Sequence, residues 1–152
     1  HEVLRGVTEM FAPEAEAKGL GLTLRLGAPD GPVDAYPLMR ALANLVSNAI
    51  KYSRQGRVLI ALRRTGPVWR VEIHDTGPGL ATAQFAEALG RTARLERDRP
   101  QTEGSGLGLT IVRDIVKAQG WTMTRCNHRR TGASIRLEIP APSILADPPS
   151  ST

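Results

Sequence analysis

The residues best suited to chemistry stand in one short run, "NLVSNAIKYS", residues 44–53. Asn44 and Asn48 are four residues apart, so on a helix they share one face, one turn apart. Lys51 follows three residues after Asn48 and lies on that side. Two amides and an ammonium so placed could serve a magnesium ion and phosphate oxygens, because magnesium takes oxygen ligands and keeps several from water and phosphate. A polar helix face in solvent is the alternative interpretation.

A second run, "HDTGPGL" at residues 74–80, places an acid at the end of an expected strand, followed by two alternating glycines. Asp75 could accept a hydrogen bond from an exocyclic amine. Gly77 and Gly79 would let the backbone pass close to a flat base, because glycine carries no side chain. An ordinary Asp-Gly turn has the same composition and remains the alternative.

A third run, "GSGLGLTIV" at residues 104–112, carries three glycines at alternate positions. It is neither the G-x-G-x-x-G dinucleotide fingerprint nor a Walker loop, which needs a lysine after its last glycine. It does open a helix, so its free N–H groups and the positive end of the helix dipole favour an anion such as phosphate. A closely packed loop-to-helix junction is the alternative.

The elements that must position these runs follow from apolar spacing and from glycine and proline punctuation. Pro13 is expected to bend or shorten the first helix, and Pro37 to mark the start of the second. Two consecutive strand pairs argue against a purely parallel winding and favour a mixed, largely antiparallel sheet with helices on one face, an α/β two-layer sandwich. The expected helices are 2–18, near 37–52, 83–89 and 107–119, and the expected strands are 20–26, 57–64, 68–74, 121–126 and 133–139.

Length and composition set the remaining limits. With 152 residues, the chain fits one domain over residues 1–140, followed by a proline- and serine-rich tail, 141–152, expected to be disordered. The single cysteine, Cys126, excludes an internal disulfide and a cysteine-based metal site, and suits a reducing compartment. The net charge of +5 raises nucleic-acid binding as an alternative, but the arginines are scattered and aromatic residues make up only 4%.

In this order the three runs resemble the N box, the first glycine box and the second glycine box of sensor histidine kinases. The segment "RRTGASIRLEIP", residues 129–140, resembles the last glycine-containing strand of the same domain. The resemblance covers nearly the whole ordered chain. It implies the Bergerat ATP-binding fold, shared with gyrase and MutL, with a mixed five-stranded sheet, about three main helices on one face and a flexible ATP lid.

The resemblance also implies roles for individual residues. Asp75 would read the adenine amine, Asn48 would ligate magnesium with Asn44 assisting, and Lys51 would contact phosphate. Tyr52 would pack near the base or sugar, and the glycines of the third run would shape the hinge of the lid. The nucleotide-binding set implied in this way is Asn44, Asn48, Lys51, Tyr52, Asp75, Gly77, Gly79, Leu80, Gly104, Ser105, Gly106, Leu107, Gly108 and Leu109.

Position 44 bears on the reaction. Family members that hydrolyse ATP carry a glutamate four residues before the magnesium asparagine, whereas this chain has Asn44, and an amide cannot act as a general base. Phosphoryl transfer to a histidine on a separate helical dimerisation and phosphoacceptor domain is therefore favoured, with a response regulator downstream. Arg94 and Arg91 in the expected lid, residues 91–103, are the candidates to neutralise the γ-phosphate, beside Asn48 and Lys51.

The chain departs from the family pattern in its lid. The expected aromatic pair is replaced by "EALGRTAR", residues 87–94. A regulatory ATP-binding module without kinase activity is therefore the alternative function. The first residues, "HEVLRG", superficially resemble the phosphoacceptor box, but Gly6 and Val7 replace its usual Thr/Asn-Pro and no helical hairpin fits before the N box. His1 is therefore interpreted as a domain edge, and His74 as structural.

The absence of a long apolar run predicts a cytoplasmic domain that makes no membrane contact, in a parent protein that an inner-membrane anchor would suit.

Overall fold

The computed structural model describes residues 1–53, 55–76, 107–128 and 132–141. The expected short helix at 83–89, the expected lid at 91–103 and the tail from residue 142 lie outside this part. The helices and strands, in chain order, are α1 (Glu2–Ala17), β1 (Gly21–Leu26), α2 (Ala35–Tyr52), β2 (Arg57–Thr65), β3 (Val68–Asp75), α4 (Leu107–Gln119), β4 (Thr122–His128) and β5 (Gly132–Pro140).

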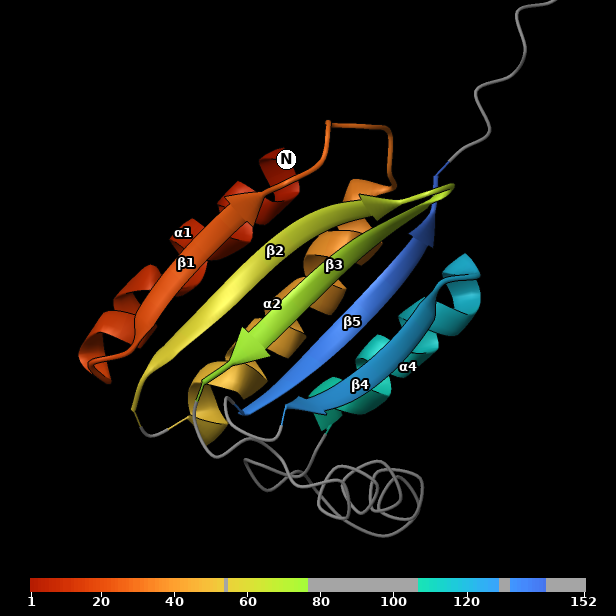
Figure 1. Cartoon of the computed structure of the whole chain (residues 1–152). Helices are drawn as coiled ribbons and strands as arrows, with labels where there is room; N and C mark the ends of the chain where they lie inside the picture. Colours follow the sequence, from red (N-terminus) through yellow and green to blue (C-terminus); the bar gives the residue numbers. More distant parts are fainter. Residues whose placement is uncertain (54, 77–106, 129–131, 142–152) are drawn as a thin grey trace, which may run out of the picture.

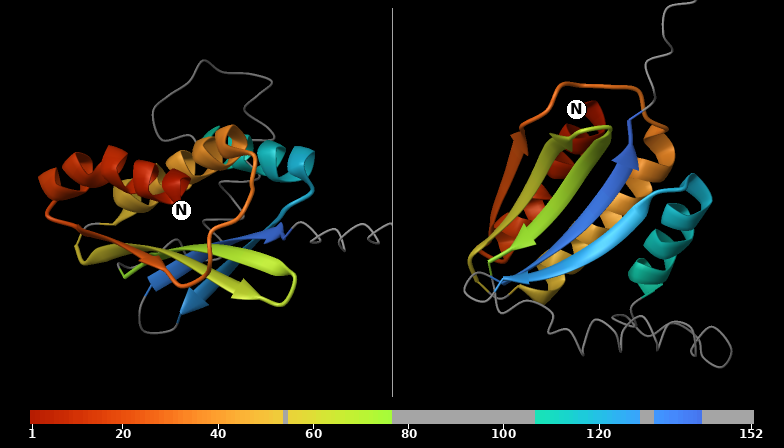
Figure 2. Two further views of the ribbon diagram at one scale, coloured as in Figure 1. Left: turned by 90° about the horizontal axis from the view of Figure 1, so that it is seen from above. Right: turned by 45° about the vertical axis from the view of Figure 1, so that its right-hand side comes forward.

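The elements form two layers, with the sheet on one side and α1, α2 and α4 on the other (Figures 1 and 2). The strand order is β1-β2-β3-β5-β4. Only β1 and β2 run parallel, as the crossover through α2 requires, and the three other pairs are antiparallel. The predicted mixed five-stranded α/β sandwich is confirmed.

Helix α2 is the centre of the helical layer, since it contacts both α1 and α4 as well as strands β2 and β3. Its apolar residues recur every three or four positions and form a continuous buried stripe. That stripe packs on the inward-facing residues of the sheet, which fixes the rotation of α2 and therefore where its polar face points. Its buried residues are Leu38, Ala41, Leu42, Leu45, Val46 and Ile50.

One boundary differs from the sequence predictions. Helix α2 begins at Ala35, two residues before Pro37, because the first turn of a helix has no N–H partner to lose and tolerates proline beyond its first position. Helix α1 ends at Ala17, one residue from the predicted end at 18, and is not shortened at Pro13, which lies inside it. The two helix stops were predicted correctly, since Gly19 and Gly120 have φ of 70° and 71°, a conformation that favours glycine.

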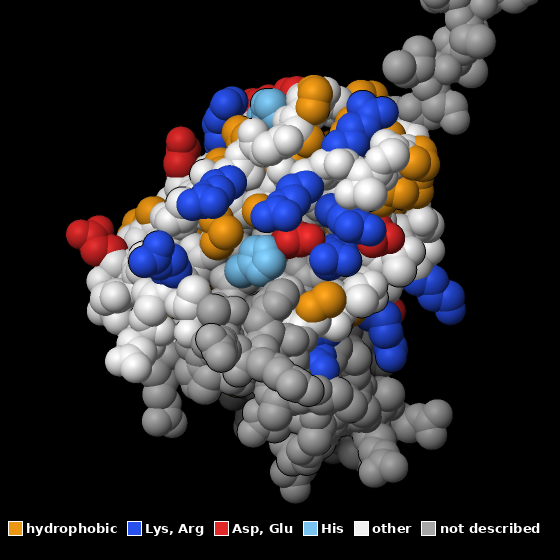
Figure 3. Space-filling view, in the orientation of Figure 1, with side chains coloured by type: hydrophobic (Ala, Val, Ile, Leu, Met, Phe, Trp, Pro, Cys, Tyr) orange, Lys and Arg blue, Asp and Glu red, His pale blue; other side chains and the backbone are white. Residues whose placement is uncertain are grey.

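The face of the sheet away from the helices carries charged side chains (Figure 3). Arg136 Nε donates to Glu72 Oε1 at 2.9 Å, and His74 Nε2 donates to Glu72 Oε2 at 2.8 Å. Beside them, Arg70 Nε donates to Glu138 at 3.2 Å. The prediction that His74 is structural agrees with this pairing. In the part of the chain described, no helix is long and apolar enough to cross a membrane.

Candidate functional site

The described ends of the three motif runs lie at the same end of the molecule. The C-terminal end of α2, the end of β3 and the start of α4 all lie on the lower side of the molecule in Figure 1. This follows from the topology, because β3, which precedes the glycines at 77 and 79, and α2, which carries residues 44–53, both extend toward that end of the molecule. The run at 44–53 and the run at 104–112 are thereby brought together across about sixty residues of sequence, through the contact of α2 with α4.

Asn44 and Asn48 occupy successive turns of α2, and both are half-buried. The side-chain amide nitrogen of Asn44 donates to the carbonyl oxygen of Arg40 at 2.8 Å. This bond commits the nitrogen to the helix, which leaves the amide oxygen as the group that can face a ligand. Magnesium prefers oxygen ligands, so this orientation of the Asn44 amide agrees with the expected metal site.

Lys51 and Tyr52 form the exposed end of α2. The Lys51 ammonium lies 5.8 Å from the centroid of the Tyr52 ring, within the range of a cation–π contact. Tyr52 is 37% exposed, so its ring is available as a surface for a flat ligand. The two side chains thus present a positive charge and an aromatic face at the same helix end.

Asp75 is the last residue of β3 and its side chain is on the helix side of the sheet, in register with the core residue Val58. It is 8% exposed, which is unusual for a carboxylate. The predicted position of the acid at the tip of a strand is confirmed. Thr76, which follows it, was not singled out in the sequence, and its hydroxyl accepts from the backbone N–H of Arg57 at 2.8 Å.

The first turn of α4 contains the last part of the third run. Leu107 opens the helix, as predicted, and Gly108 and Leu109 follow. Leu109 is 2% exposed and packs in the core, so its backbone rather than its side chain is the group that can meet a ligand. The first N–H groups of a helix have no intrahelical acceptor, which makes this end suitable for a phosphate.

The remaining predicted residues lie outside the described part of the chain. They are Gly77, Gly79, Leu80, Arg91, Arg94, Gly104, Ser105 and Gly106. The described residues alone supply an acid that can accept from an amine, amide oxygens for a divalent cation, an ammonium and free backbone N–H groups. This donor set fits magnesium and a nucleoside triphosphate.

The fold and this set of groups define a nucleotide-binding domain, and comparison with known proteins gives its family. Residues 33–143 match the model of the histidine kinase-, DNA gyrase B- and HSP90-like ATPases. The chain belongs to this family. The resemblance to sensor histidine kinases is confirmed as well, because its curated relatives are named sensor proteins or sensory kinases and a similar solved structure is a mycobacterial sensor histidine kinase, MprB.

Two such relatives are the sensor protein SphS of Synechococcus elongatus and the aerobic respiration control sensor protein ArcB of Escherichia coli. The chain is 36% identical to SphS over 149 residues, covering 91% of this chain and 36% of SphS. It is 29% identical to ArcB over 151 residues, covering 95% of this chain and 19% of ArcB. The chain therefore spans about a third or less of these relatives.

Solved structures agree. Full-length ShkA in complex with AMPPNP superposes with a TM-score of 0.73 at 31% identity, covering 91% of this chain and 29% of that one. The catalytic domain of histidine kinase ThkA superposes with a TM-score of 0.75 at 23% identity, covering 91% of this chain and 90% of that one, which bears on the fold alone. The Bergerat fold inferred from the sequence is thus confirmed.

Proposed function

We propose that residues 1–140 bind Mg-ATP and donate its γ-phosphoryl group to a histidine on a separate dimerisation and phosphoacceptor domain of the same parent protein. The observation that carries the proposal is that the C-terminal half of α2, which carries Asn48 and Lys51, and the end of β3, which carries the buried Asp75, lie at the same end of the sheet. In this proposal the reaction belongs to a two-component signalling pathway in the cytoplasm, and a response regulator receives the phosphoryl group.

Phosphoryl transfer requires the domain to position ATP and to neutralise the charge of its phosphates. A nitrogen of the acceptor imidazole attacks the γ-phosphorus, the bond from that phosphorus to the β–γ bridging oxygen breaks, and ADP leaves with the bonding electrons. Asp75 holds the adenine amine, and Lys51 and the first N–H groups of α4 offset phosphate charge. Magnesium, held by Asn48 with Asn44 assisting, would supply further neutralisation of that charge.

The nature of residue 44 supports transfer over hydrolysis. The amide of Asn44 cannot take a proton from water, and its nitrogen is already bonded to the Arg40 carbonyl. The acceptor histidine is not expected within this chain either. His1 lies at the opposite end of the sheet from the candidate site, where its Nε2 is 2.8 Å from the carbonyl oxygen of Ala28 (Figure 1).

The test is phosphotransfer from γ-phosphate-labelled ATP. The chain is incubated alone and with the acceptor hairpin domain of its parent. Label is expected on the acceptor domain only, and an Asn48→Ala variant is expected to abolish that label. Label on the chain in the absence of the acceptor domain would contradict the proposal.

A second candidate function is a regulatory ATP-binding module that has lost kinase activity. The sequence observation that favours it is "EALGRTAR" at residues 87–94, where the family carries an aromatic pair. The same assay separates the two functions. Normal Mg-ATP binding by the chain, together with no label on the acceptor domain, would establish the regulatory module instead.

A further inference from the structure

The C-terminal turn of α2 is capped by the side chain of Lys18, the residue that follows helix α1. The ammonium of Lys18 donates to the carbonyl oxygens of Ile50 at 2.6 Å, Lys51 at 3.1 Å and Ser53 at 2.9 Å. These carbonyls belong to the last turn and cap of α2, where a helix has acceptors without intrahelical donors. A lysine ammonium has three N–H donors, so this contact uses all of them.

This contact bears directly on the proposed phosphate-binding lysine. A lysine in the last turn of a helix commonly folds back to cap the final carbonyls and to meet the negative end of the dipole. Lys51 stands in that position, but Lys18 already occupies the carbonyls. Lys51 instead extends over the ring of Tyr52, 5.8 Å from its centroid, on the exposed side of the helix end.

A second hydrogen bond joins the connection between α1 and β1 to the turn between α2 and β2. The backbone N–H of Gly21, three residues after Lys18, donates to the carbonyl oxygen of Gly56 at 3.0 Å. The segment from the end of α1 to the start of β1 therefore donates hydrogen bonds to two carbonyl oxygens of the turn between α2 and β2, those of Ser53 and Gly56.

We propose that Lys18 is a positioning residue of the nucleotide site, which caps α2 so that Lys51 is presented to the phosphates rather than folded back on its own helix end. This inference rests on the proposed function, since it assumes that Lys51 contacts phosphate. When Lys18 is lost, the Lys51 ammonium is expected to fold back to the vacated carbonyls of its own helix end and to be withdrawn from the ligand. Adenine recognition by Asp75 is on β3 and does not depend on the contact.

The test measures two ligands on each variant by calorimetry: Mg-ATP, which engages Lys51, and adenosine, which has no phosphate. Lys18→Met is expected to weaken Mg-ATP about five- to tenfold, the scale of one or two hydrogen-bonded interactions, and to change adenosine binding less than twofold. Lys18→Arg, which keeps a multiple N–H donor at the helix end, is expected to recover Mg-ATP binding to within about threefold of the wild type.

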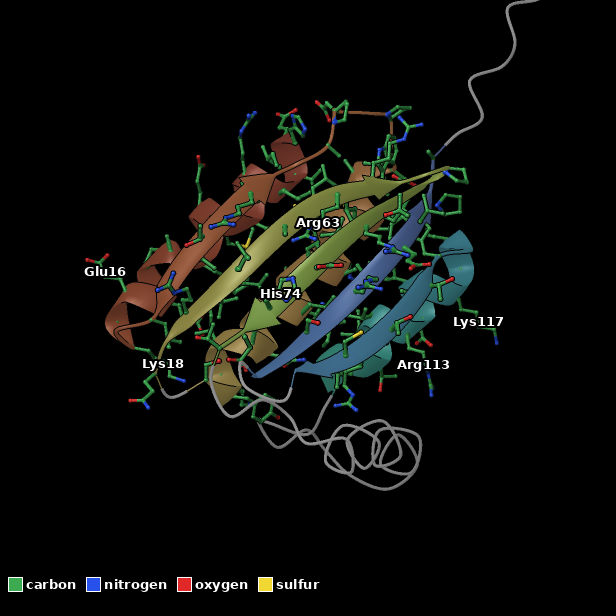
Figure 4. The ribbon with its side chains drawn as sticks, viewed as in Figure 1. Glu16, Lys18, Arg63, His74, Arg113 and Lys117 are labelled. Carbon is green, nitrogen blue, oxygen red and sulfur yellow. The ribbon has the colours of Figure 1, made fainter. Side chains whose placement is uncertain are left out.

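Lys117→Met is the matched control, because Lys117 also stands in the last turn of a helix but on α4, away from Lys18 (Figure 4). Its Mg-ATP affinity is expected to match the wild type. A loss of Mg-ATP and adenosine affinity by the same factor in Lys18→Met would show a general structural role and overturn the proposal, and so would no loss of either.

A double variant tests whether Lys18 affects Mg-ATP affinity by positioning Lys51. In a Lys51→Met background, Lys18→Met is expected to cause no further loss of Mg-ATP affinity, because its effect is exerted through a group already removed. Equal losses in both backgrounds would overturn the positioning role while leaving the proposed function intact. A wild-type chain that binds neither ligand would instead remove the proposed function, and the inference with it.

If Lys18→Met does not fold, Lys18→Arg and Lys18→Gln decide the matter. Lys18→Gln can donate only two N–H bonds and carries no charge, so its Mg-ATP affinity is expected to be below that of Lys18→Arg, with adenosine binding equal in the two. The reverse order for Mg-ATP would contradict the proposal.

Discussion

The hydroxyl of Thr76 bridges both backbone polar groups of Arg57. It accepts from the Arg57 N–H at 2.8 Å and donates to the Arg57 carbonyl oxygen at 3.1 Å. The N–H of Thr76 donates to the same carbonyl at 3.1 Å. The residue that follows the adenine-reading candidate Asp75 is thus fixed to the first residue of β2, five positions beyond the end of α2. This link therefore connects the end of β3, where Asp75 lies, to the segment that follows α2.

Replacing Thr76 by valine removes both hydroxyl bonds at nearly constant volume. The free energy of unfolding is expected to fall by about 1–2 kcal/mol, and Mg-ATP affinity to fall severalfold because Asp75 is released with the strand end. Urea denaturation and calorimetry measure the two effects. Thr23→Val is the control, an exposed threonine on β1, and it is expected to change neither quantity. Unchanged stability in Thr76→Val would show that the link is dispensable.

Gly56 provides a second test of this corner. Its φ is +100°, and a Cβ added there would clash with the Thr76 hydroxyl oxygen. Gly66 has a φ of +56° with nothing within 4 Å of an added Cβ, so it isolates the backbone cost. Gly56→Ala is expected to destabilise by about 2–3 kcal/mol and Gly66→Ala by about 1 kcal/mol. Equal changes in the urea midpoint of the two variants would rule out the steric contact with Thr76.

Sequence reasoning succeeded where the signal is local. Helix α4 begins at Leu107 and ends at Gln119 as predicted, since glycines mark both ends and the apolar spacing between them is regular. Asp75 was placed at a strand end because an acid followed by alternating glycines interrupts a β-branched run. The apolar stripe of α2 placed Asn44 and Asn48 on the other face of the helix.

Contacts that join distant segments could not be predicted in the same way. Lys18 meets its carbonyls across 32 to 35 residues, and nothing in its neighbourhood distinguishes it from any lysine at a helix end. Glu72 meets Arg136 only because β3 and β5 pair in one particular register, which turn composition does not specify. The predicted lid arginines, Arg91 and Arg94, lie outside the described residues and stay predictions.

Glu72 gives a prediction for pH. Burial raises the pKa of Glu72, but the hydrogen bond from His74 and the charge of Arg136 outweigh burial, so the pKa lies below its ordinary value of 4.5. A carboxyl whose pKa is lowered by folding stabilises the fold above its unfolded pKa, and this contribution is lost as pH falls through the folded pKa. Wild-type stability is therefore expected to decline below about pH 4.5.

The comparison that isolates this effect is Glu72→Gln. At pH 6 the variant is expected to be about 1–3 kcal/mol less stable, because Arg136 and His74 lose a charged acceptor. Its difference from the wild type is expected to shrink as the pH falls below about 4.5, because the unfolded carboxyl takes up a proton before the folded one does. Glu16→Gln, on the exposed face of α1, is the control. A gap that stayed constant from pH 6 to pH 3 would show that Glu72 does not titrate with folding.

The most direct test of adenine binding at Asp75 is the affinity of Mg-ATP for the wild type and for Asp75→Asn, measured by calorimetry. Asp114, an exposed aspartate of α4, provides the matched control Asp114→Asn, which is expected to bind like the wild type. Asp75→Asn is expected to bind about 10- to 100-fold more weakly, the scale of one lost charge-assisted hydrogen bond. Undiminished binding by Asp75→Asn would contradict the placement of the adenine at the end of β3.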